Sequence, residues 1–344
     1  MNKTKLSIIV SLLLSITLIV IILKLTINPS TFEHLSTVNI RHEFFVAAGA
    51  LNILGWFVWG ARLRLMSQSI DKNLKLSLVQ TTKIIITSNF LACITPSMAG
   101  GEPVRIHLLK KEGMTLGGAT AAVIGERLLD AVYVLICVPI ALFIFKDYIE
   151  LSVIRSGVII GVIVFMIFVV LFFYAIKFPE KTKAALIWLS NKIKGNKSTK
   201  IVKKINREVD NFQHSMVFFS GKEKKSLLKG GILTVMIWSV SFLKPSMILL
   251  GLGLSPFFIQ SYAAQVLLLV IIMMPTLPGS VGVTEVGLVG LYGMLISTSL
   301  IGVFVILFRL LTYHMNLIVG AFFQYRIFKS VASFSIGKLG EKND

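Results

Sequence analysis

Long apolar segments recur along the whole chain and are separated by short polar stretches. Six of them approach or exceed the roughly 20 residues that a membrane-spanning helix needs: 6–27, 44–61, 115–145, 153–176, 230–250 and 299–325. Two other apolar segments are interrupted and divide into shorter arms, 79–94 with 101–111 and 258–274 with 284–296. Arms this short suit re-entrant half-helices better than full spans. The pattern predicts an all-α polytopic membrane protein with about six transmembrane helices and two re-entrant helical hairpins.

Both interruptions combine proline and glycine with charged residues. The first runs from Thr95 to Arg105 and the second from Pro275 to Glu285. Proline removes a backbone donor, so such a break is tolerated at membrane depth only where it is buried in protein or lines a wet cavity. We therefore expect the two breaks to face each other and to form the working site. The expected hairpin tips, where glycine would supply positive φ, are Pro96, Gly100, Gly101, Pro278, Gly279 and Gly282.

Composition agrees with a membrane protein and argues against a nucleic-acid partner. Hydrophobic residues make up 55% of the 344 positions and charged residues only 15%, whereas soluble domains carry about 25% charge. The net charge of +19 comes from basic residues that gather in the loops between spans. The positive-inside rule explains this distribution better than nucleic-acid binding does.

The basic residues also predict the orientation of the chain. With the N-terminus inside and both broken segments returning to the side they entered, the inside holds fourteen Lys and Arg residues of 177–229, together with Arg62 and Arg64. The outside loops then hold only Arg41, Lys146 and Arg155. If the first broken segment crossed fully, the large basic cluster would face out. The sequence thus predicts a multi-pass cell-membrane protein with both termini cytoplasmic.

Residues 177–229 are the only sizeable polar segment, with fourteen basic and four acidic residues. Apolar residues recur there at helical spacing: Ile201, Ile205, Val209 and Phe212. They suggest an amphipathic helix that lies on anionic lipid. A solvated cytoplasmic loop is the alternative interpretation.

The two halves of the chain repeat the same order of features. Glu102 and Glu285 are 183 positions apart, and Arg127 and Arg309 are 182 apart. Because the first hairpin would enter from inside and the second from outside, the pattern predicts an inverted-topology repeat, as in many secondary transporters. The expected divisions are 1–43, a first helix and external loop; 44–146, repeat 1; 147–229, a linking helix and the basic segment; 230–326, repeat 2; and 327–344, a cytoplasmic tail.

Several charged side chains fall at the expected depth of the bilayer centre. A charge there costs about 2.5–3.5 kcal/mol even on the permissive insertion scale and is a functional hypothesis by default. The candidate substrate-binding residues are Arg127, Arg309, Arg105, Glu102, Glu126, Asp130 and Glu285. Buried structural pairs, Arg127 with Asp130 and Glu285 with Arg309, are the alternative. Arg105 follows Glu102 by three residues, so it either belongs to the site or forms an intrahelical pair.

Other polar and aromatic residues are given structural interpretations. Lys24, Lys83 and Lys244 are expected to snorkel towards the interfaces. Trp56 and Trp59 fit an interfacial aromatic belt. We expect no catalytic residue, metal site or cofactor, because no P-loop, metal-ligand spacing or nucleophile–base pattern occurs.

The motifs as a set resemble the lysylphosphatidylglycerol synthase transmembrane region, a flippase-like membrane family. The resemblance rests on Ser88-Asn89-Phe90, Thr95-Pro96, Gly100 to Arg105 and Glu126-Arg127 with Asp130, and on Leu277-Pro278-Gly279, Gly282 to Glu285 and Arg309 with Tyr313. Ser97-Met98 stands where the family often has glycine. Family members with a known reaction carry an additional soluble transferase domain, so the resemblance implies lipid translocation here and not the transferase reaction.

The leading expectation is therefore a protein that flips an anionic lipid or a polyprenyl-phosphate-linked lipid through a cavity between the hairpins. Two alternatives remain open: an ion-coupled exporter of a small soluble solute, and a non-transporting subunit that docks a separate soluble transferase. The expected partners are anionic membrane lipids and, for the last alternative, that transferase. A homodimer is left open.

Overall fold

The structure is a computed structural model that describes residues 39–95, 100–146, 177–194, 224–272 and 280–331, and a few single positions between these ranges. The helices are α3 (His42–Ile70), α4 (Leu78–Cys93), α5 (Gly101–Lys111), α6 (Leu116–Phe145), α8 (Pro179–Lys194), α10 (Lys224–Gly251), α11 (Phe258–Ile272), α12 (Val283–Tyr292), α13 (Thr298–Arg309), η1 (Leu310–His314) and α14 (Met315–Val331). No strand occurs in these ranges, as expected for an all-α protein.

Four helical stretches of the described chain are long and apolar enough to cross a membrane: His42–Ile70, Leu116–Phe145, Lys225–Gly251 and Thr298–Phe323. They coincide with four of the six expected spans. The expected span at 6–27 lies outside the described residues, and only single positions of 153–176 are described. The protein is therefore a polytopic membrane protein.

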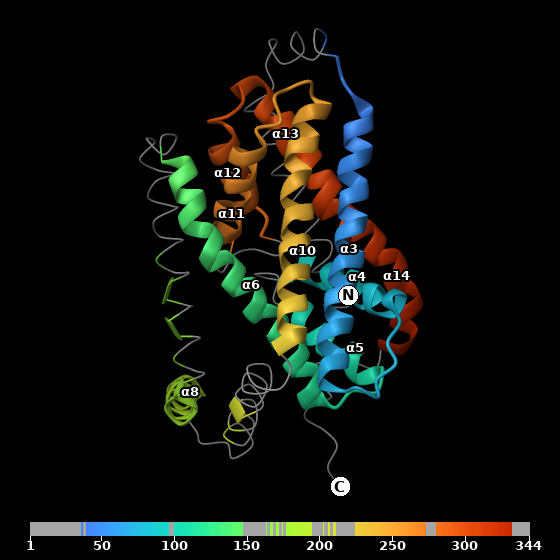
Figure 1. The fold of residues 1–344 in the computed structure, drawn as a ribbon, viewed down its shortest axis with the longest axis vertical. Coiled ribbons are helices and arrows are strands. Elements are labelled where there is room, and N and C mark those ends of the chain that lie inside the picture. The colour runs from blue at the N-terminus through green and yellow to red at the C-terminus, as the bar shows by residue number, and fades with distance from the viewer. Residues whose placement is uncertain are drawn as a thin grey trace.

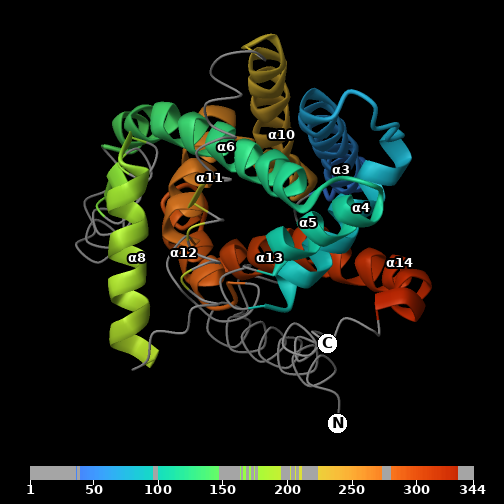
Figure 2. The same ribbon diagram turned by 90° about the horizontal axis from the view of Figure 1, so that it is seen from below.

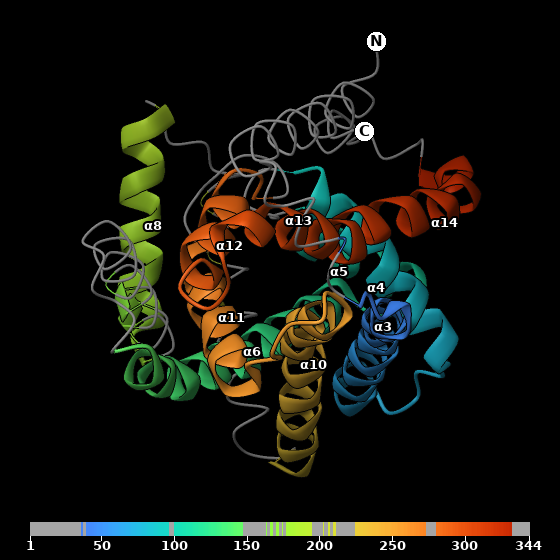
Figure 3. The same cartoon turned by 90° about the horizontal axis from the view of Figure 1, so that it is seen from above.

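Helices α3 and α10 form a closely packed pair on one side of the molecule. They run side by side along the long axis, and α6 crosses beside them at an incline (Figure 1). Seen from either end, the remaining helices surround the middle of the molecule (Figures 2 and 3). Close packing near the middle of α3 is possible because Gly60 lies against Thr82 of α4, where a Cβ would come within 2.5 Å of the threonine hydroxyl.

Two apolar cores stabilise two different parts of the fold. One contains residues of α3, α4, α5 and α6, including Leu63, Ile85 and Leu109. The other is formed mainly by α6 and the helices from α10 to α13, and includes Phe242, Leu288 and Phe304. The first and second halves of the chain thus each have a core, and α6 contributes to both.

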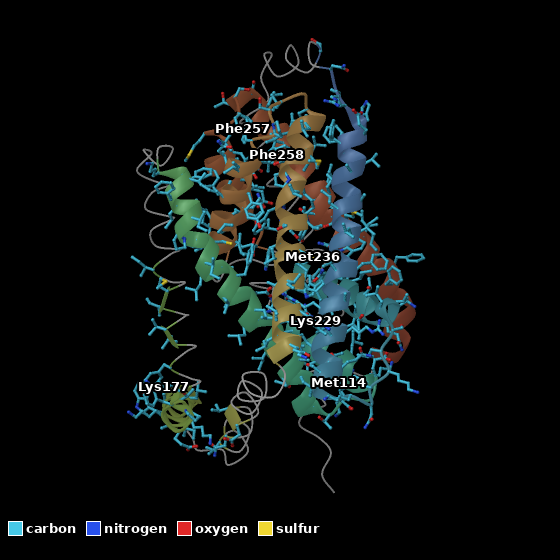
Figure 4. All side chains as sticks on the ribbon, viewed as in Figure 1. Met114, Lys177, Lys229, Met236, Phe257 and Phe258 are labelled. Carbon is cyan, nitrogen blue, oxygen red and sulfur yellow. The ribbon has the colours of Figure 1, made fainter. Side chains whose placement is uncertain are left out.

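The arms of the two broken segments form short helices that pack in pairs, α4 against α5 and α11 against α12. These helices contain 16, 11, 15 and 10 residues. Helix α4 begins at a capping box in which the Ser77 hydroxyl accepts from the Gln80 N–H and the Gln80 side chain accepts from the Ser77 N–H. Met114, just after α5, lies near the same end of the molecule as Lys229, whereas Phe258 at the start of α11 lies near the opposite end (Figure 4).

The tips of the breaks are only partly described. Pro96, Pro278 and Gly279 lie outside the described residues. Gly282 has φ +92°, as expected for a tip glycine. The expectation of positive φ is wrong for Gly100, which has φ −75°, and for Gly101, which is the first residue of α5. These two glycines are needed for close contact instead, because a Cβ on Gly101 would lie 3.2 Å from the Ser88 carbonyl oxygen of α4.

The last span differs from the uninterrupted α-helix that its apolar length suggests. Between α13 and α14 the chain makes a π-helical turn over Leu310–His314. Single π-turns inside α-helices often occur at functional sites. This one directly follows Arg309 and contains Tyr313.

The basic segment is represented by α8 and single positions. The Lys183 ammonium lies 2.7 Å from the Asp210 carboxylate and 2.6 Å from that of Glu180. Hydrogen bonds to Asp210 first and Glu180 second raise the pKa of Lys183. The amphipathic helix expected from Ile201, Ile205, Val209 and Phe212 falls mostly outside the described residues.

Candidate functional site

Arg62 of α3 lies at the centre of a buried ion network. Its Nη1 donates to Asp130 Oδ1 at 2.6 Å and to Thr234 Oγ1 at 2.8 Å, and its Nε donates to Glu126 Oε1 at 3.2 Å. The Arg62 side chain is only 1% exposed. The prediction that Arg62 belongs to an inside loop is wrong, because α3 continues to Ile70 and turns Arg62 inward against α6 and α10.

Glu126 of α6 pairs with two arginines. Its Oε1 accepts from Arg62, and its Oε2 accepts from Arg105 Nη1 at 2.8 Å. Arg105 also contacts the Ser88 hydroxyl through Nη2 at 3.5 Å. Of the two alternatives for Arg105, the intrahelical pair with Glu102 is not formed, since Arg105 points from α5 into the bundle and pairs with Glu126 of α6.

Arg127 forms the accessible edge of the same network. Its Nη2 lies 2.7 Å from Glu102 Oε1 and its Nη1 lies 3.2 Å from Asp130 Oδ2. The side chains of Arg127 and Glu102 are 38% and 33% exposed, whereas those of Arg62, Arg105 and Glu126 are almost completely buried. The expected pair of Arg127 and Asp130 is therefore present, but Arg127 is not buried.

Trp59 of α3 organises the three arginines. The guanidinium carbons of Arg62, Arg105 and Arg127 lie 5.8, 4.8 and 5.9 Å from the centre of one of its rings. Cations at these distances are attracted by the electron-rich face of an indole. Trp59 thus packs against a charged cluster, a role that its assignment to an interfacial belt did not include. The cluster of Arg62, Arg105, Arg127, Glu102, Glu126 and Asp130 is called the α6 network below.

A second ion pair joins the later half of the chain. Arg309 Nε at the end of α13 lies 2.8 Å from Glu285 Oε1 of α12, and both side chains are at most 5% exposed. The other oxygen of Glu285 accepts from the Gly282 N–H at 2.7 Å and thereby caps α12. The π-turn places the Tyr313 ring 4.2 Å from the Arg309 guanidinium carbon. The expected pair of Glu285 and Arg309 is thus present and buried.

Trp238 of α10 connects the two sets of charges. Its Nε1 donates to Asp130 Oδ1 of the α6 network at 3.1 Å. Its side chain also lines a cavity of about 180 Å³ beside Arg309, Ser280, Thr312 and Tyr313. Hence the two charged regions lie on either side of one indole.

Lys244 of α10 also lines this cavity and is buried, with an exposure of 9%. Its Nζ donates to Asn52 Oδ1 of α3 at 3.0 Å. The expectation that Lys244 snorkels to the interface was wrong, since its side chain points between α3 and α10.

The described residues contain no group of three or more His, Cys, Asp or Glu side chains that could hold a metal ion. Cys93 and Cys137 are free thiols, and Cys93 is buried. The described part of the chain thus offers ion pairs and hydrogen-bond donors rather than ligands for a metal.

Sequence reasoning missed Arg62, Trp59, Trp238 and Lys244. A charge on an otherwise apolar helix was the available signal for Arg62 and Lys244, and the proximity of both to span ends concealed it. For the two tryptophans the sequence carries no signal, since indoles occur both at membrane interfaces and against arginine. The seven predicted residues fall into two groups, with Arg309 and Glu285 apart from the other five.

The comparisons with known proteins find relatives that are membrane proteins. A family model described as the lysylphosphatidylglycerol synthase TM region matches residues 8–320. The chain is 30% identical over 331 residues to a UPF0104 membrane protein of Archaeoglobus fulgidus, with 93% of this chain and 97% of the relative covered.

Two further UPF0104 membrane proteins are each 25% identical to the chain. The relative from Pyrococcus horikoshii matches over 288 residues, 80% of this chain and 83% of its own length. The relative from Methanothermobacter thermautotrophicus matches over 255 residues, 69% of this chain and 70% of its own length. No solved structure matches the chain. The extent of the family match shows that this membrane protein belongs to the lysylphosphatidylglycerol synthase transmembrane-region family.

Proposed function

We propose that this protein moves the head group of an anionic lipid across the membrane. The observation that carries the proposal is Arg127, a partly exposed arginine inside a membrane protein whose other network arginines are buried. An accessible guanidinium can exchange a carboxylate partner for a phosphate, which it binds with similar bidentate geometry. Glu102 then holds Arg127 in place while no substrate is bound.

A groove on the other side of α6 favours a lipid over a soluble solute. It encloses about 640 Å³ between α6 and α10. Its lining is entirely apolar: Leu128, Leu129, Val132, Leu227, Leu228, Gly231, Ile232 and Val235. The groove residues of α6 share helical turns with Arg127 and Asp130, so a hydrocarbon chain in the groove lies at the level of the α6 network.

The short helix pairs support a path between two re-entrant hairpins. None of the four helices reaches the roughly 20 residues of a full span. The α4–α5 pair ends near Met114 and the α11–α12 pair begins at Phe258, at opposite ends of the molecule (Figure 4). In the proposal these pairs enter from opposite faces of the membrane and are related as an inverted repeat.

The orientation follows from the basic residues at one end. Lys177 and Lys229 lie near the end that also carries Met114 (Figure 4). By the positive-inside rule this end faces the cytoplasm, and both termini are assigned to the same side.

The test is a lipid-transfer assay in sealed liposomes. A fluorescent phosphatidylglycerol is incorporated into both leaflets, and a membrane-impermeant quencher reports how fast the inner-leaflet label reaches the outside. Wild-type protein should accelerate this transfer over protein-free liposomes. Arg127→Ala should slow it at least tenfold, because the accessible cation is lost while the buried arginines stay paired.

Arg64→Ala is the matched control, since Arg64 is an exposed arginine on the helix that carries Arg62. It should transfer lipid at the wild-type rate. Both variants should elute as single peaks in detergent, because neither removes a buried charge. Transfer no faster than in empty liposomes, or Arg127→Ala equal to wild type, would overturn the proposal.

A further inference from the structure

The cavity beside Trp238 is partly open and is lined mainly by helices of the second half of the fold. It has a volume of about 180 Å³ and is lined from α10, α11, the start of α12 and the π-turn, with Cys93 of α4 at one wall. This is smaller than the roughly 300–1,000 Å³ of pockets that hold drug-sized ligands. The cavity therefore has room for one small group rather than for a whole lipid.

Lys244 brings a positive charge to this cavity without a carboxylate in reach among the described residues. Among the described residues, its Nζ donates one hydrogen bond, to the neutral amide oxygen of Asn52. An ammonium group has three donors and is costly to bury without an opposite charge. A buried, incompletely paired cation inside a membrane protein indicates a functional site.

Two more donors at the cavity lack partners within the described chain. Arg309 Nη2 is buried without a hydrogen bond, and so is the hydroxyl of Ser280. Arg309 Nε is close to Glu285 Oε1, but the pair is not aligned as a hydrogen bond. Buried donors of this kind are normally satisfied, so their presence points to an absent ligand or water.

The charges around the cavity do not cancel. Lys244 and Arg309 are cations, and Glu285 is the carboxylate that contacts Arg309. The α6 network, by contrast, contains three arginines and three carboxylates and is neutral. The described side chains at the cavity thus carry a net positive charge, whereas those of the network sum to zero.

We infer that this cavity binds a single phosphate group through Lys244, Arg309 Nη2 and the Ser280 hydroxyl. Charge-assisted hydrogen bonds from an ammonium and a guanidinium are the strongest that protein side chains give to phosphate. The source is either the phosphate of a lipid head group or free inorganic phosphate. Only the choice of a lipid as one source rests on the proposed function; the site itself does not.

Binding is measured on the purified chain in detergent by thermal unfolding and by tryptophan fluorescence, since Trp238 lines the cavity. Three probes are compared: inorganic phosphate, mixed micelles with phosphatidylglycerol, and mixed micelles with diacylglycerol, which lacks a phosphate. A ligand that binds only the folded state raises the unfolding temperature. At least one phosphate source should do so, and diacylglycerol should not. Stabilisation by phosphate alone identifies the free ion as the ligand, and stabilisation by phosphatidylglycerol alone identifies the lipid.

Lys244→Met keeps the apolar stem and removes the charge, and it should weaken binding at least tenfold. Lys225→Met is the matched control, because Lys225 is an exposed lysine of the same helix. Ser280→Ala should weaken binding severalfold, and it decides the question if Lys244→Met does not fold.

Equal binding by Lys244→Met and wild type would overturn the site, as would the absence of binding to either phosphate source. If Lys244→Met does not fold, phosphate binding by Ser280→Ala equal to that of the wild type would overturn the site. Phosphate binding without lipid transfer in liposomes would instead reject the proposed function and keep the site.

Discussion

At the scale of single residues, the α6 network is held together by two carboxylates that each pair with two arginines. Glu126 binds Arg62 and Arg105, and Asp130 binds Arg62 and Arg127. Three guanidinium groups can gather around Trp59 only because three carboxylates lie between them. The arrangement is neutral as a whole and sensitive to the loss of any one acid.

Glu126→Gln should therefore destabilise the protein strongly. The substitution keeps the shape of the side chain but leaves two buried arginines without their shared negative charge. Breaking a buried pair in this way costs about 3–5 kcal/mol. The unfolding temperature in detergent should fall markedly, and much of the variant should aggregate.

The matched control is Glu43→Gln, because Glu43 is 64% exposed and pairs with Arg41. Such a surface pair contributes about 0–1 kcal/mol, so the unfolding temperature should barely change. An unchanged unfolding temperature for Glu126→Gln would mean that the two arginines find other partners.

The chemistry of this site is visible in the sequence where a charge interrupts an apolar segment. Glu126, Arg127 and Asp130 stand in the middle of a long span, so their importance could be predicted. Their partners could not, because residues near a span end can point either to water or into the bundle. Arg62 and Lys244 point into the bundle. Their direction depends on how α3 packs against α10 and α6, which the sequence does not give.

At the scale of elements, the glycines beside the breaks have two separate roles. Gly282 has a backbone conformation that side chains disfavour, and its N–H is held by Glu285. Gly101 has an ordinary helical backbone but sits against α4. The sequence correctly predicts that glycine is required at both breaks. It does not tell whether the reason is a positive φ, as at Gly282, or close contact with another helix, as at Gly101.

Gly282→Ala and Gly101→Ala should both lower stability and lipid transfer. Alanine at positive φ is strained by about 1 kcal/mol or more. A Cβ at Gly101 would press on Ser88 and Ala92 and move α5 away from α4. The measurements are the unfolding temperature and the transfer rate per folded protein.

Gly55→Ala provides the comparison within α3. A Cβ there would meet its nearest neighbour, Val240, at 3.9 Å, which is an ordinary contact. Since alanine is the better helix former, this variant should be as stable as wild type or more so. If all three variants have the same unfolding temperature and transfer rate, glycine is not specifically required at the helix ends beside the breaks.

At the scale of the whole molecule, the four long helices and the basic end define a polarity. Lys225 lies in the first turn of α10, and Gly251 ends the same helix. The N–H of Arg41 is bonded to the Gly251 carbonyl oxygen, so Arg41 lies at the opposite end from Lys225. The positions of these four spans could be predicted from hydropathy alone, because each is long and apolar enough to cross a bilayer.

Cysteines placed at Lys225 and at Arg41 should therefore be labelled from opposite sides of the membrane. The background is a variant with Cys93→Ala and Cys137→Ala, and the reagent is an impermeant maleimide applied to intact cells. Arg41→Cys should react in intact cells, and Lys225→Cys only after the cells are opened. Reaction of Lys225→Cys in intact cells would reverse the orientation given by the positive-inside rule.

The π-turn at Leu310–His314 is equivalent to one residue inserted into an α-helix. Each residue advances a helix by about 100°, so the insertion rotates everything after it by that amount relative to an unbroken helix. This rotation determines which side of α14 faces α4. On that side Gly320 lies against Phe90. Relatives without the insertion should show a one-residue gap at this position in an alignment and should present a different side of their last helix to the rest of the fold.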